Sequence, residues 1–333
     1  MDPLTQGALG ACVPQSASRN SNVLIAGLLG FLSGMAPDLD VFFRSKSDPL
    51  LFLEYHRQFT HSLIFIPIGG LICATVFYYL FARRAQLSFK LTYFFCTLGY
   101  ATHGLLDSCT SYGTQLLWPF TNTRYSWDTI SIIDPLVTIP LFILIITAAL
   151  RKNNRYAMVA LVWMIAYQSF GLYQNHRASE IGFQLANERG HDPIRLEAKP
   201  TIGNLILWKV IYETEEGFYT DGVRIGLATK IYPGTLTPKL DIDRDFPWLD
   251  PHSQQAKDLK RFAWFSQDYV SVDPTNPRRV IDARYSLLPN ESTGLWSIWL
   301  SQEAEKNEHV EYRMDRDVTP EKRATFIDML SNK

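Results

Sequence analysis

The first half of this chain contains five apolar segments that lack Asp, Glu, Lys and Arg. They lie at residues 22–37, 61–82, 91–106, 135–150 and 156–175. A bilayer-spanning helix needs roughly 17 to 25 predominantly apolar residues, and the shorter segments reach that length through apolar flanks. Buried helices of a water-soluble bundle are the alternative, but several such segments in succession without a polar stripe favour the membrane. The pattern predicts an α-helical polytopic membrane domain over residues 1–175.

The second half has a different composition. From residue 176 onward charged residues are frequent, so the whole-chain values of 47% hydrophobic residues and net charge −1 average two unlike halves. Alternating strand-like stretches flank a turn at Glu216 and Gly217, and Thr319 followed by Pro320 marks the start of a final helix. We therefore expect a soluble α+β domain over residues 176–333. It shows no basic stripe or phosphate loop, so a nucleic-acid partner is not expected.

Positive charge predicts the orientation of the membrane domain. Basic residues gather in the turns between the second and third and between the fourth and fifth apolar segments: Arg83, Arg84, Lys90, Arg151, Lys152 and Arg155. Short loops rich in Lys and Arg usually face the cytoplasm. An odd number of spans then places the C-terminal domain outside the cytoplasm of a bacterial cell, with the chain in the inner membrane.

Carboxylates and imidazoles gather at the opposite ends of the apolar segments. This set comprises Asp38, Asp40, His56, His61, His103, Asp107, Asp128 and Asp134. Random placement of polar residues would populate both faces of the membrane. Ionisable side chains near hydrocarbon are costly and usually mark function. Their gathering on one face indicates a site at the outer interface.

The spacing of these residues favours a metal site. His103 and Asp107 are four residues apart and would share one helix face. In PDLD, residues 37–40, Pro37 would end the first span, and an extended segment would project Asp38 and Asp40 to the same side. Mixed imidazole and carboxylate ligands suit Zn, Mn or Fe. The alternatives are a helix-capping pair for HGLLD and an acidic turn for PDLD.

Hydrolysis is the chemistry that such a site would support. A bound metal lowers the pKa of a coordinated water and polarises an ester or phosphoester oxygen. Arg57 lies between His56 and His61 in HRQFTH and could offer its guanidinium to a phosphate or carboxylate. Thr60, a candidate N-cap, could orient a ligand or could only cap a helix.

With these residues collected, the chain resembles the YdjM-like family of inner-membrane proteins, described as metal-dependent hydrolases and in part LexA-regulated. The resemblance rests on four ordered motifs: MDPLTQGALG, PDLD, HRQFTHS and HGLLDSCTSYGTQLLWPF. It implies metal-ligand roles for Asp38, His61, His103 and Asp107, with His56 and Asp40 as further candidates. The family is more distantly similar to zinc-dependent phospholipase C and related nucleases. One departure is Gln6, which stands where the family typically has a histidine.

Together these observations predict a membrane-bound metal-dependent hydrolase. Its cofactor would be a divalent metal, Zn or Mn, and its substrate a membrane lipid or small phosphoester at the outer interface. Arg57, His56 and Asp40 are the predicted catalytic residues. Two other classes remain open: a transporter or ion-handling protein, which also carries ionisable groups within the membrane, and a hydrolase scaffold that has lost activity, for which Gln6 is the main hint.

Overall fold

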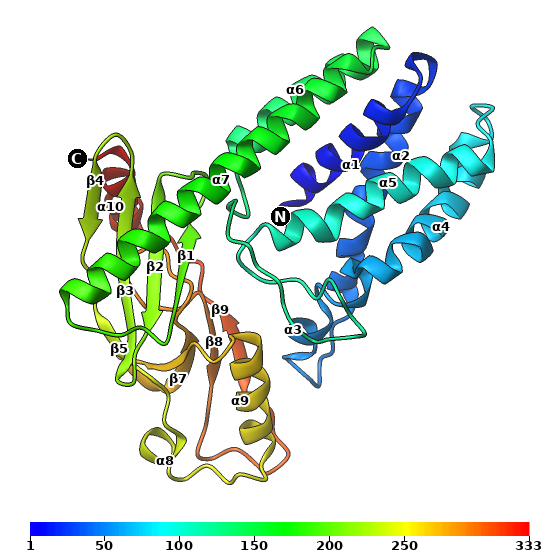
Figure 1. Ribbon diagram of the computed structural model, residues 1–333. Helices are drawn as coiled ribbons and strands as arrows, with labels where there is room; N and C mark the ends of the chain where they lie inside the picture. Colours follow the sequence, from blue (N-terminus) through cyan, green and yellow to red (C-terminus); the bar gives the residue numbers. More distant parts are fainter. Residues whose placement is uncertain (333) are drawn as a thin grey trace. The chain divides into compact units, whose positions relative to one another are not determined.

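The computed structural model describes residues 1–332, which form two compact units (Figure 1). Unit 1 contains residues 1–42, 55–173 and 202–204. Unit 2 contains residues 43–54 and 174–201 and the chain from residue 205 onward. Helix α7 runs without a break from the first unit into the second. Residues 43–54, although they lie between two membrane segments in sequence, belong to the second unit.

Unit 1 is helical. Its elements are α1 (Pro3–Ala17), η1 (Asn20–Asn22), α2 (Val23–Met35), η2 (Ala36–Phe42), η3 (Phe59–His61), η4 (Leu63–Phe65), α4 (Ile66–Phe77), the π-helical turn η5 (Tyr78–Ala82), α5 (Phe89–Ser108), α6 (Pro135–Arg151) and the first part of α7 (Arg155–Glu188). The short helix α3 (Leu51–Tyr55) crosses the boundary between the units. All five apolar segments are helical, as predicted.

Three of these helical segments are long and apolar enough to cross a membrane. They are Asn20–Phe42, Leu63–Ala82 and Arg155–Glu188, while α6 is apolar but shorter. The apolar part of the last segment ends near residue 175, and the chain continues beyond it as helix to Glu188. Large apolar side chains lie exposed along it, among them Val162 and Ile165. Such exposure is expected where lipid, instead of water, is the surrounding solvent.

Glycines bring the backbones of α1, α2 and α5 into direct contact. A Cβ atom on Gly10 of α1 would lie 2.6 Å from the carbonyl oxygen of Gly30 in α2. A Cβ atom on Gly99 of α5 would lie 2.5 Å from the same oxygen. No side chain fits at these distances, so only small residues permit the approach. This close packing positions the ends of α2 and α5, where the predicted site residues lie.

Unit 2 is built on two antiparallel sheets. The first has the order β1 (Arg195–Pro200), β2 (Leu207–Glu213), β3 (Gly217–Ile225), β4 (Thr229–Tyr232), with β5 (Leu236–Pro238) also paired to β3. The second has the order β6 (Val270–Asp273), β7 (Asn276–Asp282), β8 (Trp296–Trp299), β9 (Glu311–Met314). A buried cluster joins the first sheet to residues that flank β6 and β7; it consists of Ile211, Phe218, Tyr269 and Ala283.

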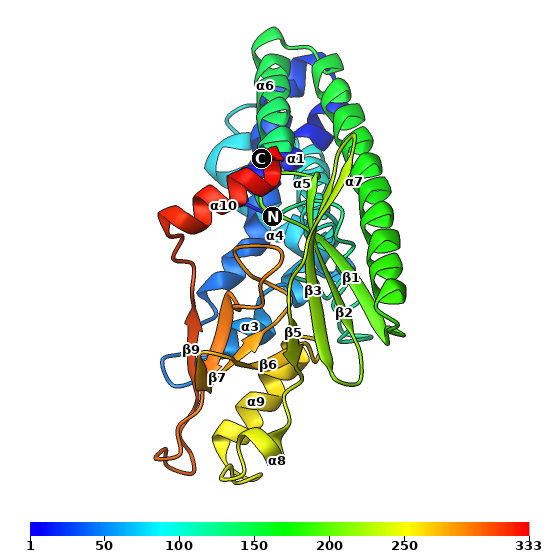
Figure 2. The same ribbon diagram turned by 90° about the vertical axis from the view of Figure 1, so that its left-hand side faces the viewer.

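Helices cover the sheets of unit 2 (Figure 2). The C-terminal part of α7 packs on the first sheet, where a Cβ on Gly182 would lie 2.6 Å from Val210. The remaining helices are α8 (Ile242–Asp245), α9 (Gln254–Phe265) and α10 (Pro320–Ser331). Thr319 caps α10 through the amide of Lys322, as its sequence predicted. The expected fold class, a helical membrane domain followed by an α+β domain, is confirmed.

Candidate metal centre

Four buried or partly buried side chains from three segments of unit 1 converge at one point. Asp38 comes from η2, His61 from η3, and His103 and Asp107 from the last turn and a half of α5. One ligand atom of each lies within 4.8 Å of those of the other three. Three of the four side chains are fully buried, and Asp38 is 21% exposed. The structure thus brings together all four residues predicted as metal ligands.

Four of the six distances between these atoms are close to the edge length of a small tetrahedron, and the other two are within 4.8 Å. Asp38 Oδ1 lies 3.5 Å from His61 Nε2 and 3.3 Å from His103 Nε2. Asp107 Oδ2 lies 3.3 Å from His61 Nε2 and 3.8 Å from His103 Nε2. Zinc bonds to nitrogen and oxygen of about 2.0–2.1 Å in tetrahedral geometry place neighbouring ligand atoms roughly 3.3 Å apart. The donor set therefore fits one such cation.

The orientation of His103 is fixed by a main-chain carbonyl. Its Nδ1 lies 2.5 Å from the carbonyl oxygen of Gly34. A carbonyl only accepts hydrogen bonds, so Nδ1 carries the proton and Nε2 of the neutral ring is an acceptor. That nitrogen points into the cluster. A histidine whose second nitrogen donates to a carbonyl is the usual arrangement of a metal ligand.

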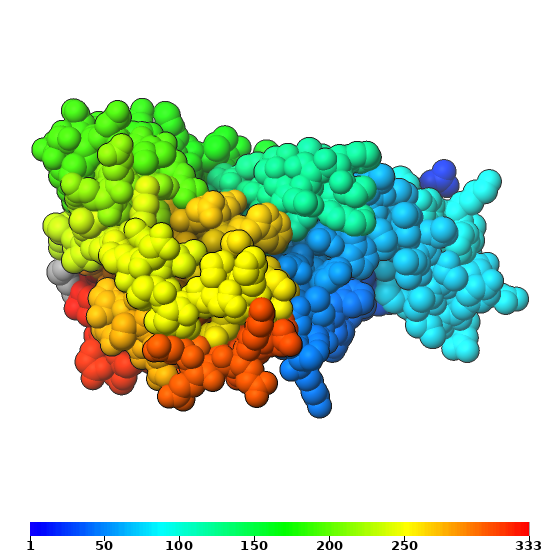
Figure 3. Space-filling model, turned by 90° about the horizontal axis from the view of Figure 1, so that it is seen from below, coloured from blue at the N-terminus to red at the C-terminus, as the bar shows by residue number. Residues whose placement is uncertain are grey.

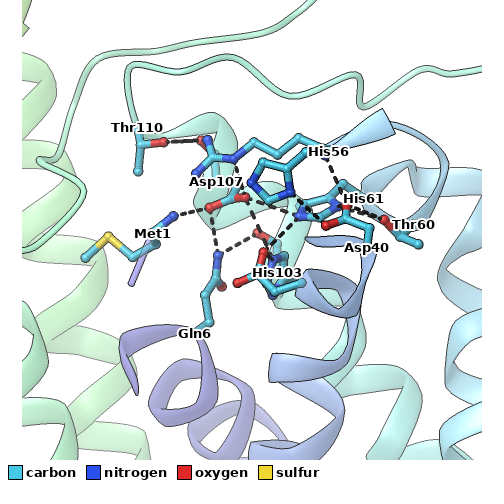
Figure 4. A network of polar contacts seen from close by, with 12 residues as sticks. Met1, Gln6, Asp40, His56, Thr60, His61, His103, Asp107 and Thr110 are labelled. Atoms are coloured by element: carbon cyan, nitrogen blue, oxygen red, sulfur yellow. Dashed lines mark hydrogen bonds and ion pairs between the residues drawn. The ribbon is translucent and has the colours of Figure 1, made fainter. Parts of the chain in front are cut away.

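The orientation of His61 follows from a chain of hydrogen bonds through Thr60. The Thr60 hydroxyl donates to Asp40 Oδ2 at 2.9 Å and therefore accepts from His61 Nδ1, also at 2.9 Å. Asp40 Oδ2 lies a further 3.2 Å from the same nitrogen. Nδ1 of His61 is thus the protonated nitrogen, and Nε2 faces Asp38 and Asp107 as an acceptor (Figure 4).

Three of the four converging atoms have no hydrogen-bond partner among residues 1–332, although Asp107 Oδ2 forms an ion pair with Arg57. Nε2 of His61, Nε2 of His103 and Oδ2 of Asp107 are all buried without one, despite their short separations. Acceptors buried against acceptors are unfavourable unless a cation lies between them. This arrangement is the strongest structural indication of a metal site.

Asp40 and His56 lie beside the four converging residues. Asp40 accepts from His56 Nδ1 at 2.7 Å and from the Arg57 amide at 3.1 Å, in addition to the Thr60 hydroxyl. Asp38, Asp40 and His56 form a second group of closely spaced ligand atoms. The bonds of Asp40 favour a role in orienting its neighbours. Its predicted catalytic role, and that of His56, remain predictions.

Arg57 is buried beside Asp107. Its Nε lies 3.0 Å from Asp107 Oδ2, and its NH1 donates to the Thr110 hydroxyl at 3.1 Å. Arg57 also adopts a left-handed backbone with φ of 63°. Such a conformation costs about 1–2 kcal/mol in a residue other than glycine, so surrounding contacts must hold it. The hydrogen bond from the Arg57 backbone amide to Asp40 is one of these contacts.

Gln6 reaches the same carboxylate from α1. Its Nε2 donates to Asp107 Oδ1 at 2.9 Å, while its Oε1 is buried without a hydrogen-bond partner among the described residues (Figure 4). The amino nitrogen of Met1 contacts the same Oδ1. Gln6 therefore acts on the site through a hydrogen bond to Asp107. The sequence identified Gln6 as a departure from the family pattern, but it did not indicate this bond.

Two local expectations about the site were wrong. PDLD is not extended, because Ala36–Phe42 forms a 3₁₀ helix that continues α2. Proline is compatible with the start of a helical turn, where its missing N–H is not needed. Thr60 is not an N-cap, because its hydroxyl donates to Asp40 and the turn containing His61 has no side-chain cap.

Two other aspartates of the one-sided set do not join the ligand groups. Asp134 is the N-cap of α6 and accepts a hydrogen bond from Tyr167 at 2.7 Å. Asp128 is buried with a left-handed backbone, φ 51°, in the segment between α5 and α6. Neither belongs to the clusters of candidate metal ligands found in the described chain.

Apolar helices and a buried His/Asp cluster together define a helical membrane protein with a candidate metal centre. Comparison with known proteins gives the family: the model of the YdjM inner membrane protein family matches residues 1–178, and the chain belongs to that family. The match covers the whole cluster. Residues 179–333 lie outside it.

Two curated relatives are similar to parts of the chain. YfhP of Bacillus subtilis, an uncharacterized protein, is 28% identical over 117 residues, which are 35% of this chain and 34% of YfhP. The inner membrane protein YbcI of Escherichia coli is 29% identical over 135 residues, which are 39% of this chain and 75% of YbcI. The chain thus spans only about a third of YfhP. No solved structure matches.

Proposed function

We propose that this protein is a membrane-embedded, metal-dependent hydrolase of phosphoesters. The observation that carries the proposal is a set of four closely spaced atoms that can each bind a cation. Two of them are imidazole nitrogens, and the other nitrogen of each ring already donates a hydrogen bond. Asp38, His61, His103 and Asp107 would hold the cation. The mixed nitrogen and oxygen donors suit zinc, with manganese as the alternative.

The residues around the ligands would supply the remaining functions. The cation, when bound, would lower the pKa of a water and polarise the phosphoester. Arg57 lies against Asp107 and would balance negative charge that develops on the phosphoryl oxygens. His56, held by Asp40 and 22% exposed, would exchange a proton with the attacking water or the leaving group. Asp40 would keep His56 and His61 oriented.

The surroundings of Asp38 favour an amphiphilic substrate. The 3₁₀ helix that carries Asp38 and Asp40 also carries Leu39, which is 61% exposed, and Phe42, which is 78% exposed. This helix ends the apolar segment Asn20–Phe42. Apolar side chains would therefore meet acyl chains next to the ligand that is most accessible. We propose a phospholipid or related lipid phosphoester, reached at the extracytoplasmic side of the inner membrane.

The test is the metal content of the detergent-purified protein, measured by mass spectrometry. We expect about one zinc or manganese per chain, lost in His103→Ala and in Asp107→Asn. His176→Ala is the matched control, because His176 is an exposed histidine outside the cluster that pairs with Glu180 on the same helix. Thermal unfolding in the same detergent must show that each variant is folded.

A wild-type protein without transition metal, even after reconstitution, would overturn the hydrolase proposal. Retained metal in both ligand variants would show that the metal lies elsewhere. Where metal is bound as expected, release of phosphate or of a phosphorylated headgroup from phospholipid vesicles is measured next, beside a soluble phosphodiester. Bound metal with no hydrolysis of either substrate would favour the degenerate scaffold.

A further inference from the structure

The segment from Phe43 to Glu54 joins two parts of the candidate metal centre. Asp40 lies three residues before this segment and His56 lies two residues after its end. The segment itself packs with unit 2, whereas the residues on either side of it belong to unit 1. The segment is therefore joined by a few covalent bonds to Asp40 at one end and to His56 and Arg57 at the other.

One arginine of α9 contacts two carboxylates of this segment. Arg261 donates from NH1 and NH2 to the two oxygens of Asp48, at 2.9 Å and 2.8 Å. Its Nε donates to Glu54 Oε1 at 2.6 Å. The guanidinium thus binds Asp48 in the middle of the segment and Glu54 at its end. Two parallel bonds to a carboxylate are among the strongest and most directional side-chain contacts.

Arg261 is also held in place by a carboxylate of its own helix. NH1 also donates to Asp258 Oδ1 at 3.0 Å, one turn earlier on α9. Asp258 is fully buried, and its other oxygen accepts from His309 Nδ1 at 2.8 Å and from the Val310 amide at 3.2 Å. A side chain held at both ends loses little further entropy in its contact with the segment. Arg261 is therefore preorganised to hold Asp48 and Glu54.

The charges at this contact argue against an incidental surface pair. Three carboxylates, Asp48, Glu54 and Asp258, converge on one guanidinium. Without it they would repel one another, and the segment carrying two of them would lose its attraction to α9. Arg261 is only 21% exposed, so solvent screens the contact less than at an open surface. In Figure 3 the chain around residue 250, in yellow, lies at the surface of unit 2, and α9 begins just after it.

We propose that Arg261 is a positioning residue that couples the C-terminal unit to the metal centre through residues 43–54. By fixing the segment, it fixes the backbone that leads into Asp40 at one end and into His56 and Arg57 at the other. Asp40 in turn orients His61 through Thr60. The part of this inference that concerns metal rests on the proposed function; the part that concerns the segment stands alone.

The size of the effect follows from the path. Supporting residues one bond from a ligand change metal affinity by about 10–100-fold. Coupling through intermediate residues is weaker, about 2–30-fold. We expect Arg261→Ala to weaken metal binding by an amount in this second range. Arg261→Lys keeps the positive charge but loses the paired N–H donors of the guanidinium, so its metal affinity should lie between those of wild type and Arg261→Ala.

The experiment uses the full-length protein in detergent and two readouts. The first is hydrogen exchange of the backbone amides of residues 40–61. The second is the affinity for zinc, together with the absorption spectrum of the cobalt-loaded protein, which reports ligand geometry. The matched control is Arg189→Ala, because Arg189 makes an equally bidentate pair with Asp221, entirely within the C-terminal sequence.

Faster exchange over residues 40–61, weaker zinc binding and a changed cobalt spectrum in Arg261→Ala, with none of these in Arg189→Ala, would support the proposal. Should Arg261→Ala fail to fold, Asp48→Asn with Glu54→Gln removes the same contacts from the other side. Unchanged exchange in a folded variant would overturn the proposal. A wild-type protein that binds no metal would instead overturn the proposed function, and the exchange data would still decide the role of Arg261.

Discussion

Gln6 provides a sharp test of how the candidate metal centre is held. The change is Gln6→Leu, which keeps a buried side chain of similar size and removes the donor to Asp107 Oδ1. Two effects on folding oppose each other. A hydrogen bond to a charged group is lost, yet a buried amide oxygen without a partner among the described residues is removed as well. We therefore expect the thermal midpoint to change little.

The effect on metal binding should be larger. Gln6 fixes one oxygen of Asp107, so that the other oxygen, Oδ2, faces His61 at 3.3 Å. Loss of a residue that orients a ligand typically costs about 10–100-fold in metal affinity. This corresponds to about 1.4–2.7 kcal/mol. Gln6→Leu should therefore separate metal affinity from stability.

The assay is zinc affinity by competition with a chelator, beside thermal unfolding in the same detergent. Gln15→Leu is the control. Gln15 lies on the same helix, is equally buried, donates once, to the Ile145 carbonyl at 3.2 Å, and also has an Oε1 atom without a partner in the described chain. It contacts no ligand. Equal zinc affinity for wild type and Gln6→Leu would refute the reasoning, as would equal losses in both variants.

Packing, burial and charge give three further predictions. Gly30→Ala should lower the unfolding free energy by about 1–3 kcal/mol or more, because the added Cβ would lie 2.1 Å from the Gly10 carbonyl oxygen. The control is Ser33→Ala, which should change the thermal midpoint little, because the buried Ser33 hydroxyl has no hydrogen-bond partner among residues 1–332. Burial lowers the pKa of Lys209 in β2 from 10.5 to about 7, although its Nζ donates to Ser286 and the Glu291 carbonyl. Between those two values the unfolded chain binds more protons, so stability should rise with pH, by up to about 1.4 kcal/mol per unit from this residue. Denaturant titrations at pH 7 and pH 9 should show a smaller rise in Lys209→Met, and an equal rise would contradict the prediction. Arg57→Lys keeps the positive charge but loses the paired N–H donors of the guanidinium, so it should lower kcat/KM for a phosphoester about tenfold or more with unchanged metal content. Unchanged turnover would remove Arg57 from the proposed mechanism.

The sequence predicts those features of the site that depend on local periodicity. Apolar segments predict helices because burial in lipid requires internally bonded backbone. His103 and Asp107 share a helix face because four residues make about one turn. To predict that the carboxylates and imidazoles gather on one face, it was enough to count how often the chain crosses the membrane. These inferences use the order of residues and the geometry of one regular element.

Other features depend on contacts between distant residues, which no local pattern encodes. The bond from Gln6 to Asp107 joins residues 101 positions apart, and the contact of Arg261 with Asp48 joins residues 213 positions apart. The packing of residues 43–54 with unit 2 likewise depends on such contacts. The extended form expected for PDLD was wrong because proline marks the end of an α-helical pattern but does not specify the conformation of the residues after it.

Pro37 shows how one residue serves both the fold and the site. Pro37, three residues after Gly34 of α2, has no N–H and offers no hydrogen bond to the Gly34 carbonyl. The Gly34 carbonyl can therefore accept from His103 Nδ1. Gly34 can pack against α1 because it has no side chain, since a Cβ there would lie 2.9 Å from the Gln6 carbonyl oxygen and from Gly10 Cα. The proline that ends α2 and the glycine that packs it together set the proton on His103, and with it the direction of the nitrogen offered to a metal.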